Sequence, residues 1–199
     1  MWPRIVIMSR GKLITIYGIN NIGKTTQAKR LVERLNANGM KAKYVKYPVY
    51  DIEPTGPFLN SVLRGGEQKI SEDELQLWFI MNRYQFQPEL EKWLKECYTV
   101  VAEDYVGTGI AWGEAKGLDR VWLEEANKFL LKEDLAVLFQ GTRDLSSLEA
   151  GHVHEENEGL IEKCRVILEE LADKFGWKRL KVQENWDDTT DLLWNLINN

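Results

Sequence analysis

The sequence predicts a three-layer α/β fold in which a five-stranded parallel sheet carries helices on both faces. Apolar runs rich in β-branched residues alternate with helical patterns along the chain, and this alternation indicates right-handed βαβ units. A glycine-rich turn joins the first apolar run to the first helical pattern. Because 199 residues is a usual length for one α/β domain, we expect residues 1–199 to fold as a single domain.

Five short apolar runs are expected to form the strands of the sheet. Pro48 closes the second run, since proline cannot continue a strand inside a sheet. The nearly continuous apolar character fits a parallel sheet, because its strands are buried on both faces. The predicted strands cover residues 13–17, 42–47, 98–102, 135–139 and 180–182.

Helical patterns fill the segments between these runs. The first places Ala28 and Leu31 on one face, at the spacing that a buried helix face requires. Ser71 and Glu74 form a capping-box pattern that begins a long helix. Pro88 predicts a break or kink in that helix, because proline lacks the backbone N–H group. The predicted helices cover residues 24–38, 55–63, 72–95, 107–113, 120–131, 155–175 and 189–197.

Composition excludes several classes of protein. The net charge of −5 argues against a nucleic-acid partner, because such surfaces usually show a basic excess. No apolar run approaches the ~20 residues that a membrane-spanning helix needs, so no membrane partner is expected. Cys97 and Cys164 form no CxxC pair, which predicts packed thiols in a reduced, cytoplasmic protein. Residues 1–10 lack the pattern of a signal peptide and are a possible N-terminal extension.

The strongest functional signal is the segment of residues 18–25, which reads GINNIGKT and is called the phosphate loop below. It fits the GxxxxGK[ST] motif between a predicted strand and a predicted helix, as in the P-loop NTPase fold. Its N–H groups can wrap around phosphate oxygens at the positive end of the helix dipole. Lys24 supplies a catalytic cation to the β- and γ-phosphates. The residues expected to hold ATP here are Gly18, Asn21, Ile22, Gly23, Lys24, Thr25 and Thr26.

Two adjacent acids follow the third predicted strand. Glu103 and Asp104 end an apolar run, where an acidic residue of a nucleotide-binding site is expected. One of them is expected either to hold Mg²⁺, together with the hydroxyl of Thr25, or to accept the proton of the acceptor. The phosphate loop and these acids together predict a site for ATP and Mg²⁺.

Several segments together resemble the thymidylate kinases, and the resemblance covers nearly the whole chain. Each segment matches a motif of that family in order and spacing: residues 16–27, 47–48, 77–83, 101–112, 134–139 and 151–159. The resemblance implies a nucleoside monophosphate kinase that forms dTDP from ATP and dTMP. It also implies a homodimer and a lid at about residues 141–158.

The resemblance further implies roles for individual residues. Phe79 would stack on the base of the acceptor, and Arg83, four residues later on the same helix face, would hydrogen-bond its edge. Glu103 aligns with the functional acid of the family, so it is expected to be catalytic and to hold Mg²⁺ together with Thr25. Asn185 lies where the family contacts adenine. The remaining residues expected to contact the acceptor are Asn20, Tyr50, Asp104, Tyr105, Thr108 and Trp112.

The sequence departs from the family where arginines are usual. Tyr50 and Asp104 occupy positions where family members commonly carry a phosphate-binding arginine, and the phosphate loop has Asn20 and Asn21. An arginine clamp stabilises charge on the transferring group, so its loss requires a replacement. Candidates are Arg64, Lys46 and Arg143, of which Arg143 is expected to be catalytic.

These departures leave two alternatives open. A deoxynucleoside kinase would accept a neutral 5′-hydroxyl group and would need a carboxylate base rather than arginines. A non-catalytic ATP-binding protein would keep the phosphate loop without transferring phosphate. His152 and His154 could suggest a metal site, but their spacing on one loop fits a polar lid better.

Overall fold

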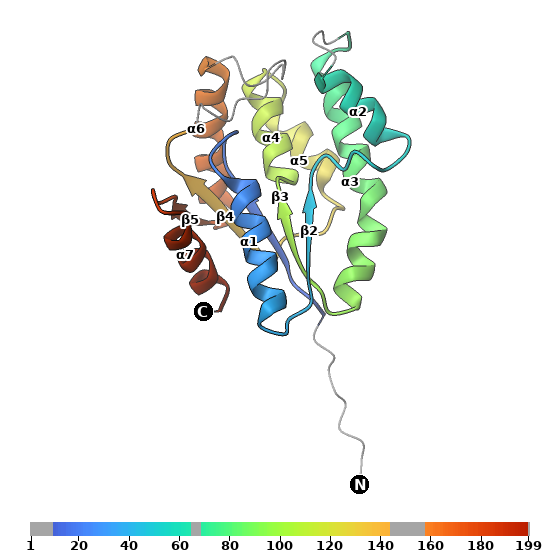
Figure 1. Ribbon diagram of the computed structural model, residues 1–199. Coiled ribbons are helices and arrows are strands. Elements are labelled where there is room, and N and C mark those ends of the chain that lie inside the picture. Colours follow the sequence, from blue (N-terminus) through green and yellow to red (C-terminus); the bar gives the residue numbers. More distant parts are fainter. Residues whose placement is uncertain (1–9, 65–68, 144–157, 199) are drawn as a thin grey trace.

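The computed structural model describes residues 10–64, 69–143 and 158–198. Five strands form one parallel sheet in the order β2-β3-β1-β4-β5 (Figure 1). The strands are β1 (Leu13–Tyr17), β2 (Ala42–Lys46), β3 (Thr99–Glu103), β4 (Leu135–Gln140) and β5 (Lys178–Lys181). The predicted five-stranded parallel sheet is confirmed.

Seven helices in the described part of the chain cover the two faces of the sheet (Figure 1). They are α1 (Lys24–Ala37), α2 (Thr55–Arg64), α3 (Glu72–Lys95), α4 (Val106–Ala115), α5 (Arg120–Asn127), α6 (Glu158–Phe175) and α7 (Trp186–Asn198). Helix α1 packs against α7 and against β1, β2 and β3, while α3 packs on β3 and α6 on β4. Because right-handed crossovers that run in opposite directions place their helices on opposite faces, α1 lies across the sheet from α3, α4 and α6.

Burial explains which apolar runs became strands. All five residues of β1 are buried, as a central strand of a covered sheet requires. The edge strand β5 buries only Leu180, and its neighbours on both sides are charged. The strand therefore begins two residues before the predicted range of 180–182, because an edge strand that pairs with β4 needs only one buried side chain.

Helix α3 corrects another prediction. It runs unbroken through Pro88, although proline cannot donate the hydrogen bond to the carbonyl four residues earlier. Leu90 and Leu94, which follow the proline, are buried in the core. Their packing holds the last turns of the helix in place, because burial of two leucines outweighs the loss of one hydrogen bond.

Two other helices begin earlier than predicted. Helix α4 starts at Val106, directly after Tyr105. Helix α7 starts at Trp186, and the side chain of Asn185 accepts a hydrogen bond of 3.0 Å from the N–H group of Asp187. This contact satisfies a backbone donor of the first turn, as a capping residue does.

The connections of β1 and β3 create a crevice at the carboxyl ends of the strands. These neighbouring strands pair in parallel, but the chain leaves β1 toward β2 and leaves β3 toward β4, in opposite directions. Ligands of open α/β sheets bind at such a switch point. The phosphate loop follows β1, and Glu103 is the last residue of β3, so both predicted phosphate-handling elements meet there.

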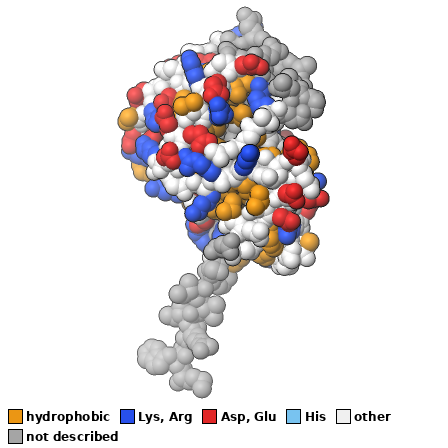
Figure 2. Space-filling model, turned by 90° about the vertical axis from the view of Figure 1, so that its left-hand side faces the viewer, with side chains coloured by type: hydrophobic (Ala, Val, Ile, Leu, Met, Phe, Trp, Pro, Cys, Tyr) orange, Lys and Arg blue, Asp and Glu red, His pale blue; other side chains and the backbone are white. Residues whose placement is uncertain are grey.

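The face beside α6, β5 and α7 carries basic and acidic side chains close together (Figure 2). Arg179 of β5, for example, pairs with Glu169 and Asp173 of α6. Within the described residues, the helices are too short or too polar to cross a membrane. Residues 1–9 of the predicted extension, most of the predicted lid and both histidines lie outside the described residues.

Candidate active site at the phosphate loop

The phosphate loop connects the end of β1 directly to the start of α1. Asn21 and Gly23 have left-handed backbone angles, with φ of 61° and 92°. Glycine is required at position 23 for a second reason: a Cβ atom there would lie 2.3 Å from the indole ring of Trp186. The loop is therefore held against the start of α7, where the backbone can curve around a phosphate group.

Lys24 is folded back into the phosphate loop. Its Nζ donates hydrogen bonds of 2.8 and 2.9 Å to the carbonyl oxygens of Gly18 and Ile19. It also lies 3.7 Å from Oδ1 of Asp104, and the residue is only 5 % exposed. The ammonium group is thus positioned at the centre of the loop by backbone atoms and by one carboxylate.

Glu103 is the most densely contacted acid of the site. It accepts a hydrogen bond of 2.7 Å from Oγ1 of Thr25 and a second one from the hydroxyl of Tyr44. Lys46 places its Nζ 3.1 Å from the Oε1 atom of Glu103. Burial acts to raise the pKa of Glu103, but the charges of Lys46 and Lys24 and the two hydrogen bonds hold it below its usual value. Glu103 is therefore ionised at neutral pH.

Asp104 directs its carboxylate into the site by an unusual backbone conformation. Its φ of 58° lies in the left-handed region, which Asp tolerates better than most residues. Oδ1 accepts a hydrogen bond of 2.7 Å from the hydroxyl of Thr108 on α4. Burial raises the pKa of Asp104, and the nearby charge of Glu103 adds to this effect, while Lys24 opposes it.

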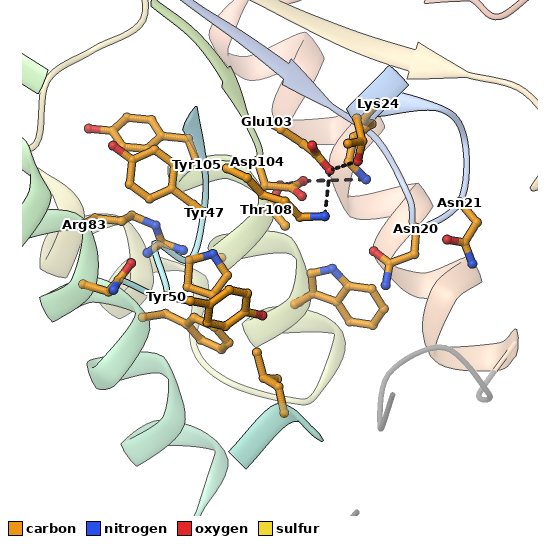
Figure 3. A pocket seen from close by; sticks show the side chains of 18 of the residues that line it. Asn20, Asn21, Lys24, Tyr47, Tyr50, Arg83, Glu103, Asp104, Tyr105 and Thr108 are labelled. Carbon is orange, nitrogen blue, oxygen red and sulfur yellow. Dashed lines mark hydrogen bonds and ion pairs between the residues drawn. The ribbon is translucent and has the colours of Figure 1, made fainter. Parts of the chain in front are cut away.

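One cavity of about 580 Å³ joins the phosphate loop to the helices α3 and α4. Figure 3 shows Arg83, Tyr47 and Tyr105 at one end and Lys24, Asn20 and Asn21 at the other, with Asp104 and Thr108 between them. The predicted residues that line this cavity are Asn20, Asn21, Gly23, Lys24, Thr25, Thr26, Tyr50, Phe79, Arg83, Glu103, Asp104, Tyr105, Thr108 and Trp112.

The end formed by α3 and α4 combines an aromatic ring with a buried cation. Phe79 is partly buried and lines the cavity. Arg83 is 5 % exposed, and its Nη1 donates a hydrogen bond of 3.1 Å to Oδ1 of Asn127. A Cβ atom on Gly109 would lie 2.1 Å from Nη2 of Arg83, so only glycine allows this close approach. A flat ring could stack on Phe79 and accept hydrogen bonds from Arg83.

Four predicted site residues do not line the cavity. Gly18 and Ile22 belong to the phosphate loop, and Gly18 contributes its carbonyl oxygen to Lys24. Arg143 donates a hydrogen bond of 3.3 Å to the carbonyl oxygen of Asn20, which places it beside the loop. Asn185 caps α7, and its neighbour Trp186 lines the cavity instead.

Sequence reasoning missed two residues that shape the site. Tyr44 hydrogen-bonds Glu103, and Trp186 covers Gly23. Strand alternation places Tyr44 on the same face of β2 as Lys46, but its contact with Glu103 depends on the pairing of β2 with β3. Trp186 gives no such local signal, because its contact joins segments far apart in the sequence.

The chain is similar to thymidylate kinases over most of its length. It is 29% identical over 183 residues to the thymidylate kinase of Homo sapiens, and the aligned region covers 88% of this chain and 84% of that protein. It is 25% identical over 183 residues to the putative thymidylate kinase 251L of Invertebrate iridescent virus 6, and that alignment covers 90% of this chain and 84% of the viral protein.

The fold leads to the same family. The solved structure of thymidylate kinase from Candida albicans superposes with a TM-score of 0.80 and 26% sequence identity, covering 95% of this chain and 92% of that chain. The family model described as "Thymidylate kinase" matches residues 16–191. Because this match includes far more than half of the 199 residues, the chain belongs to the thymidylate kinase family.

Proposed function

We propose that this protein transfers the γ-phosphate of ATP to dTMP and so forms ADP and dTDP. One observation carries the proposal: a single cavity joins the phosphate loop to the Phe79–Arg83 end. The cavity thus offers a phosphate-binding end and a base-binding end. Membership of the thymidylate kinase family supports dTMP as the acceptor.

The donor phosphates are assigned to the phosphate loop. Lys24 lies at its centre and can move from the carbonyl groups of Gly18 and Ile19 to phosphate oxygens. Such a cation stabilises the charge that spreads over the transferring phosphoryl group. Arg143, beside Asn20, is proposed to assist it, and Asn185 to lie near the adenine.

The residues for Mg²⁺ are Thr25 and Glu103. A hydroxyl and an ionised carboxylate are oxygen ligands of the kind that Mg²⁺ prefers, and here they lie 2.7 Å apart. Bound Mg²⁺ supplies positive charge to the phosphates. Glu103 is kept ionised by Lys46 and Lys24, so the chain presents a ligand of the correct charge.

The acceptor is assigned to the other end of the cavity. The thymine ring stacks on Phe79, and Arg83 donates to a ring carbonyl group. Trp112, Tyr105 and Thr108 line the walls of this end together with Asn20 and Tyr50. This arrangement points the 5′-phosphate of dTMP toward Lys24 and excludes bulk water by closing around the base.

We also propose a homodimer in the cytoplasm. Leu77 and Met81, one turn apart on α3, are 45 % and 42 % exposed, and a second copy of the chain would cover them. Sedimentation of the protein tests the dimer: a single species of 23.2 kDa at micromolar concentration would contradict it.

The proposed location in the cytoplasm follows from the cysteines. Cys97 and Cys164 are free thiols, as in proteins of a reduced compartment.

A release assay tests the proposed reaction. ADP formation is measured with ATP and Mg²⁺ in the presence of dTMP, of thymidine, or of no acceptor. The proposal predicts that dTMP stimulates ADP release strongly and thymidine does not. Release with thymidine alone would indicate a deoxynucleoside kinase, and equal release without any acceptor would indicate an ATPase.

A further inference from the structure

Lys46 lines the cavity, and the proposed reaction uses it only to keep Glu103 ionised, without a contact to either substrate. It is the last residue of β2, and its sheet partner on β3 is Glu103. The side chain is 48 % exposed, whereas that of Glu103 is 3 % exposed. The ammonium group carries three donors, so the 3.1 Å contact with Glu103 leaves others available to the cavity.

Lys46 brings positive charge to the cavity, because a lysine side chain is normally protonated throughout the neutral range. Tyr50 and Asp104 line the same cavity as Lys46.

Geometry limits where the phosphate of the acceptor can lie. It must approach the γ-phosphate at the phosphate loop while its base remains between Phe79 and Arg83. Tyr50 and Asp104 line the intervening part of the cavity. Neither side chain is positive, and Asp104 is a carboxylate, so a dianionic phosphate needs a cation at this point.

Three of the other cations that line the described cavity are engaged away from this point. Lys24 donates to the phosphate loop, and Arg83 is buried against Asn127. Lys116 is held by both carboxylate oxygens of Glu72 at 2.7 Å. Arg64, at the end of α2, lies 5.6 Å from the centre of the Tyr50 ring, whereas Lys46 contacts Glu103, which ends β3 beside the phosphate loop.

We propose that Lys46 is the cation that binds the 5′-phosphate of the acceptor, held in position by Glu103. This inference rests on the proposed function, because it assumes an acceptor that already carries a phosphate group. Lys46 thereby discriminates a nucleoside monophosphate from a nucleoside.

A binding measurement tests this role without relying on turnover. The dissociation constants of dTMP and thymidine are measured by calorimetry for the natural protein and for Lys46→Met, and the constant for thymidine divided by the constant for dTMP reports the contribution of the phosphate. A charge-assisted contact predicts that Lys46→Met lowers this ratio about 10- to 100-fold. The constant for thymidine should stay unchanged, and Lys46→Arg should restore most of the ratio.

Two controls separate Lys46 from its neighbours. Lys41→Met removes an exposed cation that lies over the ring of Tyr98, outside the residues lining the cavity, and should leave the ratio unchanged. The Lys46→Met change is repeated in a Glu103→Gln background. If Lys46 acts only by masking Glu103, the double variant will equal Glu103→Gln, which would overturn the proposal. A further fall of the ratio supports direct contact.

The proposal and the proposed function fail in different ways. If the natural protein phosphorylates dTMP but Lys46→Met keeps the natural ratio, only the role of Lys46 is wrong. If the natural protein binds dTMP and thymidine equally, no cation serves the phosphate and the role of Lys46 is also wrong. Absence of dTMP turnover beside a ratio that depends on Lys46 would contradict the proposed reaction alone.

Discussion

Thr25 and Glu103 are joined by a hydrogen bond of 2.7 Å, although 78 residues separate them in the chain. The bond links the first turn of α1 to the end of β3 across the switch point of the sheet. It brings a hydroxyl and an ionised carboxylate together beside the phosphate loop. The pairing of β1 with β3 thus brings together the two side chains that are proposed to bind Mg²⁺.

Glu103→Gln is expected to impair the use of Mg²⁺. The amide keeps the size of the side chain but removes its charge, so the Mg²⁺ concentration for half-maximal activity should rise by about 10- to 100-fold. Titration of activity with Mg²⁺ measures this change. Glu184→Gln, at an exposed position outside the cavity lining, is the matched control. An unchanged Mg²⁺ requirement in the Glu103 variant would remove Glu103 from the metal site.

Lys24→Ala is expected to lower kcat for dTMP by at least about 10²- to 10³-fold, because it removes the cation at the transferring phosphate. The fold should persist, since the lost side chain contacts the carbonyl groups of one loop. Steady-state rates and circular dichroism measure the two effects. A variant that folds and keeps the natural rate would contradict the role of the phosphate loop.

Phe79→Ala is expected to weaken dTMP binding by about 5- to 150-fold, which corresponds to the ~1–3 kcal/mol of base stacking. The affinity for ATP should change little, because ATP is assigned to the other end of the cavity. Fluorescence or calorimetric titration compares the two ligands. Phe129, 74 % exposed, supplies a control substitution to Ala. Equal losses for both ligands would show that Phe79 supports the whole domain instead.

Asp104→Asn is expected to stabilise the ligand-free protein at neutral pH. Burial raises the pKa of Asp104 in the folded state, so ionisation costs stability. That cost is absent below about pH 3.9, the usual pKa of Asp, and grows as the pH rises toward the raised folded pKa. Asn tolerates the left-handed φ of 58°, which limits backbone strain.

Thermal unfolding at several pH values measures this effect. The melting temperature of Asp104→Asn should exceed that of the natural protein at pH 7, and the difference should shrink as the pH falls to 4. A variant that loses stability at pH 7 and recovers it at pH 4 would show that the ion pair with Lys24 outweighs burial.

The sequence predicts those parts of the site that depend on local patterns. The phosphate loop is one continuous motif, and Phe79 and Arg83 share one turn of helix, so spacing alone places them. Glu103 ends an apolar strand that must lie beside the loop in a parallel sheet. Phe79, Arg83, Glu103 and most residues of the phosphate loop line the cavity.

Contacts between distant segments could not be predicted in the same way. Tyr44 and Lys46 reach Glu103 because β2 pairs with β3, and no local pattern specifies that pairing. Trp186 covers Gly23 because α7 packs on α1. The unbroken helix through Pro88 likewise reflects tertiary packing, which outweighed a local preference.

Transfer of labelled phosphate tests the central claim most directly. The purified protein is incubated with γ-labelled ATP, Mg²⁺ and dTMP, and the nucleotides are separated. The account predicts labelled dTDP that accumulates in step with ADP, and at least about 100-fold less of it in the same time with Lys24→Ala. Label that appears only as inorganic phosphate, or on thymidine but not on dTMP, would contradict it.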